Sequence, residues 1–218
     1  MKPLLLFDLD GTLLDTLQDL TDSVNHTLLK YNCPTHTREQ VCSFVGHGVK
    51  NLIQRALPGK PDDPAVEDVL TDYLEYYALH NLDSTAPYAG IAQMLTRLAD
   101  YPVAIASNKA DQDVKPLCRR FFPGVYARGE TADCPRKPAP DMLWQIMDQL
   151  GCQKCIYIGD SEVDIQTAKN AGIPCISVTW GFRTRQQLLD AGAAYLCERP
   201  EALPALVYQL EETVLKEK

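Results

Sequence analysis

Two aspartates, Asp8 and Asp10, stand directly after the apolar run Leu4–Phe7, and Gly11 follows them. The apolar run predicts a short buried strand that ends where the polar and turn-forming residues begin. Side chains two residues apart on an extended chain point the same way, so we expect the two carboxylates to share one face. Neighbouring carboxylates repel and desolvate each other unless a cation lies between them. The pair therefore indicates a metal-assisted site in which one aspartate attacks and its neighbour moves protons.

Three further segments place polar side chains where phosphate chemistry could use them. They are Ser107-Asn108-Lys109 at the end of one strand-like run, Lys137 in the loop Lys137-Pro138-Ala139-Pro140, and Asp160 at the end of another run, with Asp164 one helical turn further on. Each segment alone has a plainer explanation, because turns with Asx hydrogen bonds, solvated loops and helix entries use the same residue types. In an open parallel sheet, however, the ligand site lies beyond the carboxyl ends of the strands. The order of the segments and their positions at strand ends favour one phosphate site.

The elements that would position these side chains alternate along the chain. Strand-like apolar runs occupy residues 102–108, 155–160, 174–179 and, less clearly, 193–197, and helical stripes of apolar residues separate them. This alternation from residue 85 onward predicts an α/β fold with a Rossmann-like parallel sheet that helices cover on both faces.

Residues 15–83 interrupt the alternation. Thr37 and Gln40 fit a capping box, Asp63-Pro64 fits a helix start, and no convincing strand occurs in this stretch. We therefore predict a core domain from residues 1–14 and 84–218 and a helical cap domain, residues 15–83, inserted after the first strand. Because the insertion begins directly after the aspartates, we expect it to act as a lid over them.

The composition limits the partners that the chain can bind. The 218 residues carry a formal net charge of −8 and are 45% hydrophobic, which suits one medium domain or a core with a small inserted domain. This acidic balance argues against a nucleic-acid partner, and an anionic substrate would need local cations. No apolar stretch is long enough for a signal peptide or a membrane span, so we expect a cytoplasmic protein without membrane contact.

The eight cysteines are scattered along the chain and, in that compartment, are expected to be reduced and partly buried. Cys152 and Cys155 match C-x-x-C, but no second pair or histidine at ligand spacing accompanies them. The pair also precedes a strand, whereas activated redox thiols stand at a helix start. A helix-to-strand loop with two thiols is favoured over a metal or redox site.

The segments quoted above resemble the four motifs of the haloacid dehalogenase-like superfamily of phosphotransferases. They are Phe7-Asp8-Leu9-Asp10-Gly11-Thr12, Ser107-Asn108-Lys109, Lys137-Pro138-Ala139-Pro140 and Gly159-Asp160-Ser161-Glu162-Val163-Asp164. The resemblance extends over nearly the whole chain, and residues 15–83 resemble the cap that this superfamily inserts after the first strand. Within the superfamily, three segments resemble the phosphoglycolate phosphatase group: Pro87-Tyr88-Ala89-Gly90, Asn108-Lys109 and Thr179-Trp180-Gly181-Phe182.

This resemblance implies separate roles for the core residues. Asp8 would attack phosphorus to form an aspartyl-phosphate, and Asp10 would protonate the leaving alcohol and then deprotonate water. Ser107 would donate its hydroxyl to the transferring phosphoryl group, while Lys137 would hold Asp8 and offset phosphate charge. The implied cofactor is Mg²⁺, held by Asp8, the backbone carbonyl of Asp10, Asp160 and waters, with Asp164 in support.

Four residues are further candidates for contacts with phosphate or substrate. Gly11 would permit the turn after the first strand, and Gly11 and Thr12 would offer backbone N–H groups to phosphate. Asn108 and Lys109 are expected to contact the outer part of the substrate, since they stand at a strand end.

The segment 46–50 resembles the family's substrate-specificity loop. Its His47 or Lys50 could meet a substrate carboxylate, and a helix–helix turn with exposed polar residues is the equally favoured alternative. Arg183 and Arg185 are interpreted as surface charges.

The resemblance thus implies an enzyme, a Mg²⁺-dependent phosphoric monoester hydrolase that acts on a small phosphorylated metabolite, with 2-phosphoglycolate as the leading candidate. Pyrophosphate, a sugar phosphate and pyridoxal phosphate are alternatives, because the core performs the chemistry and the cap selects the leaving group. Thr12 argues against a sugar-phosphate mutase, where we expect an apolar residue, and Asp10 argues against dehalogenases and phosphonate hydrolases. A non-enzymatic binding module is disfavoured, although fold alone does not prove function. Both a monomer and a homodimer are compatible with the sequence.

Overall fold

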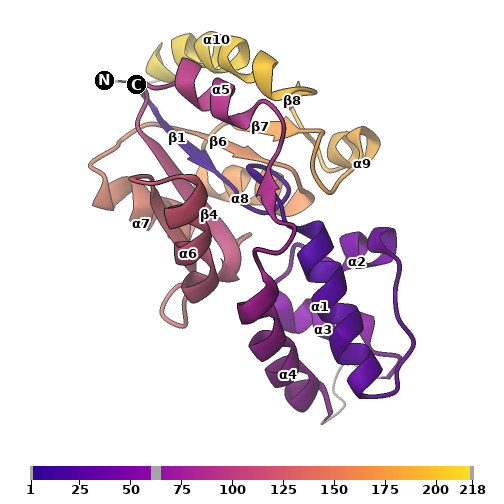
Figure 1. The fold of residues 1–218 in the computed structure, drawn as a ribbon. Helices are drawn as coiled ribbons and strands as arrows, with labels where there is room; N and C mark the ends of the chain where they lie inside the picture. The colour runs from indigo at the N-terminus through magenta and orange to yellow at the C-terminus, as the bar shows by residue number, and fades with distance from the viewer. Residues whose placement is uncertain (1, 60–64, 217–218) are drawn as a thin grey trace. The chain divides into compact units, whose positions relative to one another are not determined.

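The computed structural model describes residues 2–59 and 65–216 (Figure 1), so the helix start predicted at Asp63-Pro64 lies outside the described residues. The chain forms two compact units, one from residues 1–14 and 87–218 and one from residues 15–86. None of the helices in the described ranges is long and apolar enough to cross a membrane.

Within the described residues, the first unit is built on six strands in the spatial order β5-β4-β1-β6-β7-β8. These strands are β1 (Leu4–Phe7), β4 (Val103–Ala110), β5 (Tyr126–Glu130), β6 (Cys155–Gly159), β7 (Cys175–Val178) and β8 (Tyr195–Cys197). Neighbouring strands pair in parallel, which confirms the predicted α/β fold. The edge strand β5 was not predicted, because its sequence contains a glycine and two charged residues instead of an apolar run.

Helices cover both faces of this sheet. They are α5 (Ile91–Arg97), α6 (Asp111–Phe121), α7 (Asp141–Gln149), α8 (Glu162–Ala171), α9 (Arg185–Asp190) and α10 (Leu203–Lys216), with a 3₁₀ turn, η1 (Pro200–Ala202). Leu5 and Phe7 of β1 lie in an apolar cluster with α5, α6 and α10, while Leu4 and Leu6 lie in a second cluster with α7 and α8. Because side chains alternate between the faces of a strand, one short buried run contributes to both layers of packing.

The register of the strands brings the polar segments to one edge of the sheet. Phe7, the last residue of β1, lies beside Ile105 of β4 on one side and Ile158 of β6 on the other. The aspartate pair follows Phe7, and Ser107 and Asp160 lie two residues beyond the two partners. These side chains therefore stand together at the carboxyl ends of three adjacent strands, where ligands bind in open parallel sheets.

The second unit is helical in the part that the structure describes. Its helices are α1 (Leu17–Lys30), α2 (Arg38–Phe44), α3 (Val49–Ala56) and α4 (Ala65–His80). The capping box predicted before α2 is confirmed: the Thr37 hydroxyl accepts a hydrogen bond from the Gln40 N–H, and the Gln40 side chain accepts one from the Thr37 N–H.

The chain enters and leaves the helical unit through two paired segments, β2 (Leu14–Asp15) and β3 (Ala86–Pro87). The predicted return to the core at residue 84 is three residues earlier than the return at residue 87 in the structure. The reason lies in α1, where the buried carboxylate of Asp19 accepts hydrogen bonds from the N–H groups of Ser84, at 2.8 Å, and Thr85, at 2.9 Å. These bonds hold the returning segment to the helical unit.

Candidate active site

The loop after β1 turns sharply and closes on itself. The Leu9 carbonyl accepts hydrogen bonds from the N–H groups of Leu13 and Leu14, both at 3.0 Å. Gly11 has a φ of +86°, which L side chains rarely adopt, and an added Cβ would lie 2.3 Å from Oδ2 of Asp160. The predicted need for glycine in this turn is confirmed, and the close approach of Asp160 adds a second reason for it.

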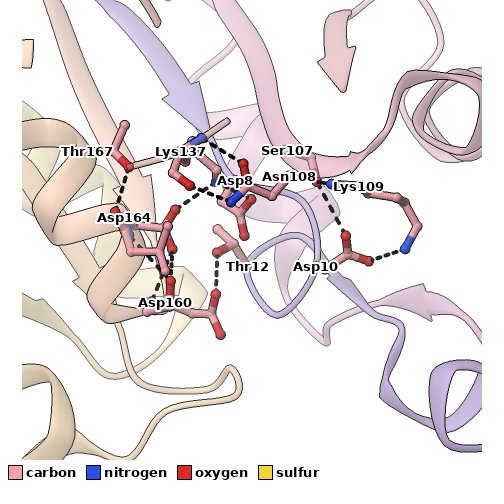
Figure 2. A network of polar contacts seen from close by, with 12 residues as sticks. Asp8, Asp10, Thr12, Ser107, Asn108, Lys109, Lys137, Asp160, Asp164 and Thr167 are labelled. Atoms are coloured by element: carbon pink, nitrogen blue, oxygen red, sulfur yellow. Dashed lines mark hydrogen bonds and ion pairs between the residues drawn. The ribbon is translucent and has the colours of Figure 1, made fainter. Parts of the chain in front are cut away.

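Lys137 lies at the centre of a buried polar network (Figure 2). Its ammonium donates to Oδ1 of Asp8 at 2.7 Å, to Oδ1 of Asp164 at 2.8 Å and to the Tyr157 hydroxyl at 2.8 Å. The Tyr157 hydroxyl in turn donates to Oδ1 of Asp164 at 2.9 Å. Because an ammonium has three N–H donors, each donor of Lys137 has an acceptor. The predicted contact between Lys137 and Asp8 is therefore present and well oriented.

Asn108 holds the backbone of Lys137. Its Nδ2 donates to the Lys137 carbonyl at 2.9 Å, and its Oδ1 accepts from the Lys137 N–H at 2.8 Å. This double hydrogen bond ties the loop before α7 to β4. The substrate contact expected of Asn108 stays a prediction; in the structure its side-chain amide binds this loop.

A second ion pair lies beside the first. Lys109 Nζ is 3.0 Å from Oδ1 of Asp10, and the Ser107 hydroxyl donates to Oδ2 of Asp10 at 3.4 Å. Figure 2 shows Asp10 turned toward these two residues, whereas Asp8 lies against Lys137. Each aspartate therefore has its own lysine partner, Lys137 for Asp8 and Lys109 for Asp10. The expectation that the two carboxylates share one face with a cation between them stays a prediction.

Within the described residues, one group of side chains could hold a metal ion: Asp8, Asp160 and Asp164, whose ligand oxygens lie within 4.8 Å of one another. All three residues are buried. The Thr12 hydroxyl donates to Oδ1 of Asp160 at 3.4 Å, and the Phe182 N–H donates to its Oδ2 at 2.6 Å. Protein donors therefore contact both oxygens of Asp160.

Burial controls the ionisation of this cluster. Loss of water raises the pKa of Asp8 from 3.8 to about 7 despite the attraction of Lys137. Burial, with Asp8 nearby, also raises the pKa of Asp160 well above its ordinary value. Burial would do the same to Asp164, but Lys137 outweighs it and leaves the pKa of Asp164 below its ordinary value. Conversely, burial would lower the pKa of Lys137, but Asp164 and Asp8 raise it instead.

The charge balance of the cluster fits a divalent cation. Three ionised carboxylates and one ammonium leave two uncompensated negative charges in a buried space. The donor atoms of this group are oxygens, which hard cations such as Mg²⁺ and Ca²⁺ prefer. Asp8 and Asp160 could hold such an ion, with Asp164 in support.

The structure brings together the core residues that the sequence selected. The side chains in this region are those of Asp8, Asp10, Thr12, Ser107, Asn108, Lys109, Lys137, Asp160 and Asp164 (Figure 2). The N–H groups of Gly11 and Thr12 donate to carbonyls of the same loop, at 2.8 and 3.3 Å, because the loop closes on itself. Their donation to phosphate, and the metal contact of the Asp10 carbonyl, stay predictions.

The two candidate residues His47 and Lys50 belong to the helical unit. His47 lies exposed in the turn between α2 and α3, and Lys50 of α3 pairs with Glu67 of α4. A substrate carboxylate would have to compete with Glu67 for Lys50. A substrate contact of either residue stays a prediction.

Two contributors to the site were missed or misinterpreted from the sequence. Tyr157 lies within the buried strand β6, yet its hydroxyl joins the Lys137 network. A tyrosine in an apolar run was the available signal, since a buried hydroxyl needs a partner. Arg183 was interpreted as a surface charge, but it is only 8% exposed and binds Glu162 through Nε and Nη2, at 2.7 and 3.1 Å.

Known proteins are similar to this chain in sequence and in structure. A profile of the haloacid dehalogenase-like hydrolase family matches residues 5–178. A phosphoglycolate phosphatase from Pseudomonas putida is 34% identical over 192 residues, which are 82% of this chain and 70% of that protein. A phosphoglycolate phosphatase from Mesorhizobium japonicum is 34% identical over 196 residues, which are 84% of this chain and 86% of that protein.

Similarity extends to three dimensions. The crystal structure of a candidate phosphoglycolate phosphatase from Lactobacillus delbrueckii subsp. bulgaricus matches with a TM-score of 0.88 at 34% identity, and the match covers 100% of both chains. The stretch that matches the family profile begins in β1 and ends with β7, so it includes the four motif-like segments.

Mg²⁺ should stabilise the protein more at high pH than at low pH. In the metal-free protein the raised pKa of Asp8 gives a contribution to stability that is present at low pH and is lost as the pH rises from about 4 to about 7, and the raised pKa of Asp160 acts in the same direction. A divalent cation held by the ionised carboxylates would compete with protons, so we expect its stabilising effect to be largest where the carboxylates are ionised. In scanning calorimetry, we expect Mg²⁺ to raise the melting temperature by about 3 °C or more at about pH 8 and by about 1 °C or less at about pH 5. An equal rise at both pH values would contradict this account.

Tyr157→Phe should lower the free energy of unfolding by about 2 kcal/mol, because it leaves one buried N–H donor of Lys137 without its acceptor. Tyr101→Phe is a matched control: Tyr101 is also a buried tyrosine bonded to a carboxylate, Glu211, but Glu211 is partly exposed and water can replace the hydroxyl. We expect a loss of about 1 kcal/mol or less there. Urea unfolding measures both losses of unfolding free energy. Equal losses would show that the hydrogen bond from Lys137 does not make Tyr157 more important for stability than Tyr101.

Proposed function

The chain belongs to the haloacid dehalogenase-like hydrolase family, and from that premise we propose that it hydrolyses a small phosphorylated metabolite through an aspartyl-phosphate on Asp8. It is an enzyme of the phosphoric monoester hydrolase class. The observation that carries the proposed mechanism is the buried cluster in which Lys137 holds Asp8 beside Asp160 and Asp164.

Asp8 is the proposed nucleophile. Lys137 binds its Oδ1 at 2.7 Å and so orients the carboxylate, and we assign the attack on phosphorus to Oδ2. The attack forms an aspartyl-phosphate and expels the alcohol, and water then attacks phosphorus and releases phosphate. Two displacements replace one direct hydrolysis, which is among the slowest uncatalysed biological reactions.

Asp10 is the proposed acid and base. Its carboxylate is oriented by Lys109 and Ser107, so it is separate from the Lys137 network. In the first displacement it would give a proton to the leaving oxygen, and in the second it would take a proton from the attacking water. Separate lysine partners allow the nucleophile and the proton carrier to hold different protonation states at the same time.

The remaining core residues are proposed to neutralise and orient the phosphoryl group. Lys137 and the Ser107 hydroxyl would offset its charge, and Gly11 and Thr12 would offer N–H groups. The proposed Mg²⁺ ligands are Asp8, the carbonyl of Asp10, and Asp160, with Asp164 in support. When bound, Mg²⁺ would neutralise negative charge on the transferring group.

2-Phosphoglycolate is the proposed substrate, since relatives 34% identical to this chain are named phosphoglycolate phosphatases. Its carboxylate would meet His47 or Lys50, and Asn108 and Lys109 would contact its outer part. Residues 15–83 are the proposed cap that selects the leaving group. Pyrophosphate, sugar phosphates and pyridoxal phosphate are the competing substrates. We further propose a cytoplasmic monomer or homodimer that binds neither nucleic acid nor membrane.

The mechanism is tested with p-nitrophenyl phosphate and Asp8→Asn. We expect the wild type to require Mg²⁺ and Asp8→Asn to lower kcat by about a thousandfold or more, because the amide cannot attack phosphorus. Asp148→Asn, which changes an exposed aspartate of α7, is the control and should keep the wild-type rate. Equal rates for wild type and Asp8→Asn would exclude the aspartyl-phosphate.

The same assay assigns the substrate when phosphorylated metabolites replace p-nitrophenyl phosphate. We expect 2-phosphoglycolate to give the highest kcat/KM among the candidates named above. A higher value for any of the others would overturn the substrate and leave the mechanism in place.

A further inference from the structure

The segment between β7 and α9, residues 179–184, lies against the residues that would hold a cation. It contacts the loop after β1, the residue Asp160 that follows β6, and Glu162 at the start of α8. We propose that this segment, through Trp180, Gly181 and Phe182, positions Asp160 and thereby sets the affinity of the site for a divalent cation. The inference rests on the proposed function, because it concerns the cation site of the same reaction.

Trp180 acts on Asp160 through Thr12. The indole Nε1 of Trp180 donates to the Thr12 carbonyl at 2.9 Å, and the Thr12 hydroxyl donates to Oδ1 of Asp160 at 3.4 Å. Thr12 is fully buried, and Trp180 packs against the apolar cluster of the sheet. The tryptophan therefore holds the residue that in turn binds one oxygen of Asp160.

Gly181 and Phe182 act on Asp160 directly. The Phe182 N–H donates to the carboxyl oxygen Oδ2 of Asp160 at 2.6 Å. At Gly181 an added Cβ would lie 2.3 Å from the Gly11 carbonyl oxygen and 2.4 Å from Oδ2 of Asp160. Glycine is therefore required for the backbone to approach both the β1 loop and the carboxylate.

Arg183 ties the segment to the start of α8. Its guanidinium binds Glu162 through two nitrogens, at 2.7 and 3.1 Å, and only 8% of the residue is exposed. Glu162 follows Asp160 by two residues and begins α8. Asp160 is thus restrained by the loop after β1 and by the segment itself, and the segment is also tied to the helix that begins two residues after Asp160.

This restraint matters because of the charge state of the site. Asp160 and Asp8 approach each other in a buried space without a full complement of positive charge. Without the hydrogen bonds from this segment, repulsion between Asp8 and Asp160 would favour other positions of the Asp160 carboxylate. Part of the binding free energy of a cation would then be used to move the carboxylate back, and the affinity for the cation would fall. Groups that orient metal ligands commonly change metal affinity by about 10- to 100-fold.

The test uses the two tryptophans of the chain. Trp180→Phe removes the N–H donor to Thr12 and keeps an aromatic ring. Trp144→Phe is the matched control: the Trp144 indole also donates to a backbone carbonyl, that of Ala171 at 3.4 Å, but it is 49% exposed and belongs to α7. In calorimetric titration we expect Trp180→Phe to weaken Mg²⁺ binding by about 10-fold and Trp144→Phe to change it by about twofold or less.

Fluorescence gives a second readout, independent of activity. In Trp144→Phe the sole tryptophan is Trp180, and we expect its emission to change with Mg²⁺ concentration along the calorimetric binding curve. The free energy of unfolding of Trp180→Phe, measured without Mg²⁺, separates a positioning role of Trp180 from a purely structural one. A purely structural role would lower this free energy and leave the affinity for Mg²⁺ unchanged. If Trp180→Phe does not fold, Thr12→Val tests the same connection, since it removes the hydroxyl that binds Asp160.

The outcomes distinguish this inference from the proposed function. Equal Mg²⁺ affinity in the wild type and Trp180→Phe, or in Thr12→Val where that variant replaces it, would overturn the inference alone. The absence of Mg²⁺ binding to the wild type would overturn the proposed cation site and the inference with it. Weakened binding in Trp180→Phe with unchanged binding in Trp144→Phe would support both.

Discussion

A lysine buried among acidic side chains organises the core of this protein. Withdrawing an ammonium from water is costly unless charged and polar partners surround it. Lys137 has such partners in Asp8, Asp164 and Tyr157, which come from the end of β1, from α8 and from β6. Asn108 joins its backbone to β4. Removal of any of these groups would leave a buried polar group unsatisfied, so the Lys137 network connects the strands and helices that position the site.

The same burial gives the site its chemical character. Lys137 offsets the negative charge of Asp164 and keeps its pKa low, whereas exclusion of water raises the pKa values of Asp8 and Asp160. A cation that binds Asp8 and Asp160 would supply the positive charge that these two carboxylates lack. A chain with a net charge of −8 needs such local positive charge near an anionic substrate. Asp10 lies in a separate pair with Lys109, so the proton transfer proposed for Asp10 could proceed apart from the proposed nucleophile, Asp8.

The sequence predicted the position of the site well, and its internal orientation less well. The run Leu4–Phe7 forms β1 with the predicted bounds. The register of the parallel strands places the aspartates that follow β1 near Ser107 and Asp160. The contacts of Tyr157 with Lys137 and of Arg183 with Glu162 could not be predicted, because these partners lie 20 and 21 residues away and only packing decides whether such side chains meet. The different lysine partners of the two aspartates could not be predicted, because they depend on how β4 and the loop before α7 pack beside the end of β1.

The most direct measurement of the central claim is a rapid acid quench of the enzyme during turnover of a radiolabelled phosphomonoester with Mg²⁺, followed by peptide mapping. The account predicts labelled phosphate on Asp8, with formation and decay at rates consistent with turnover, and no label in Asp8→Asn. Turnover by the wild type without label on Asp8, or with label on another side chain, would contradict it.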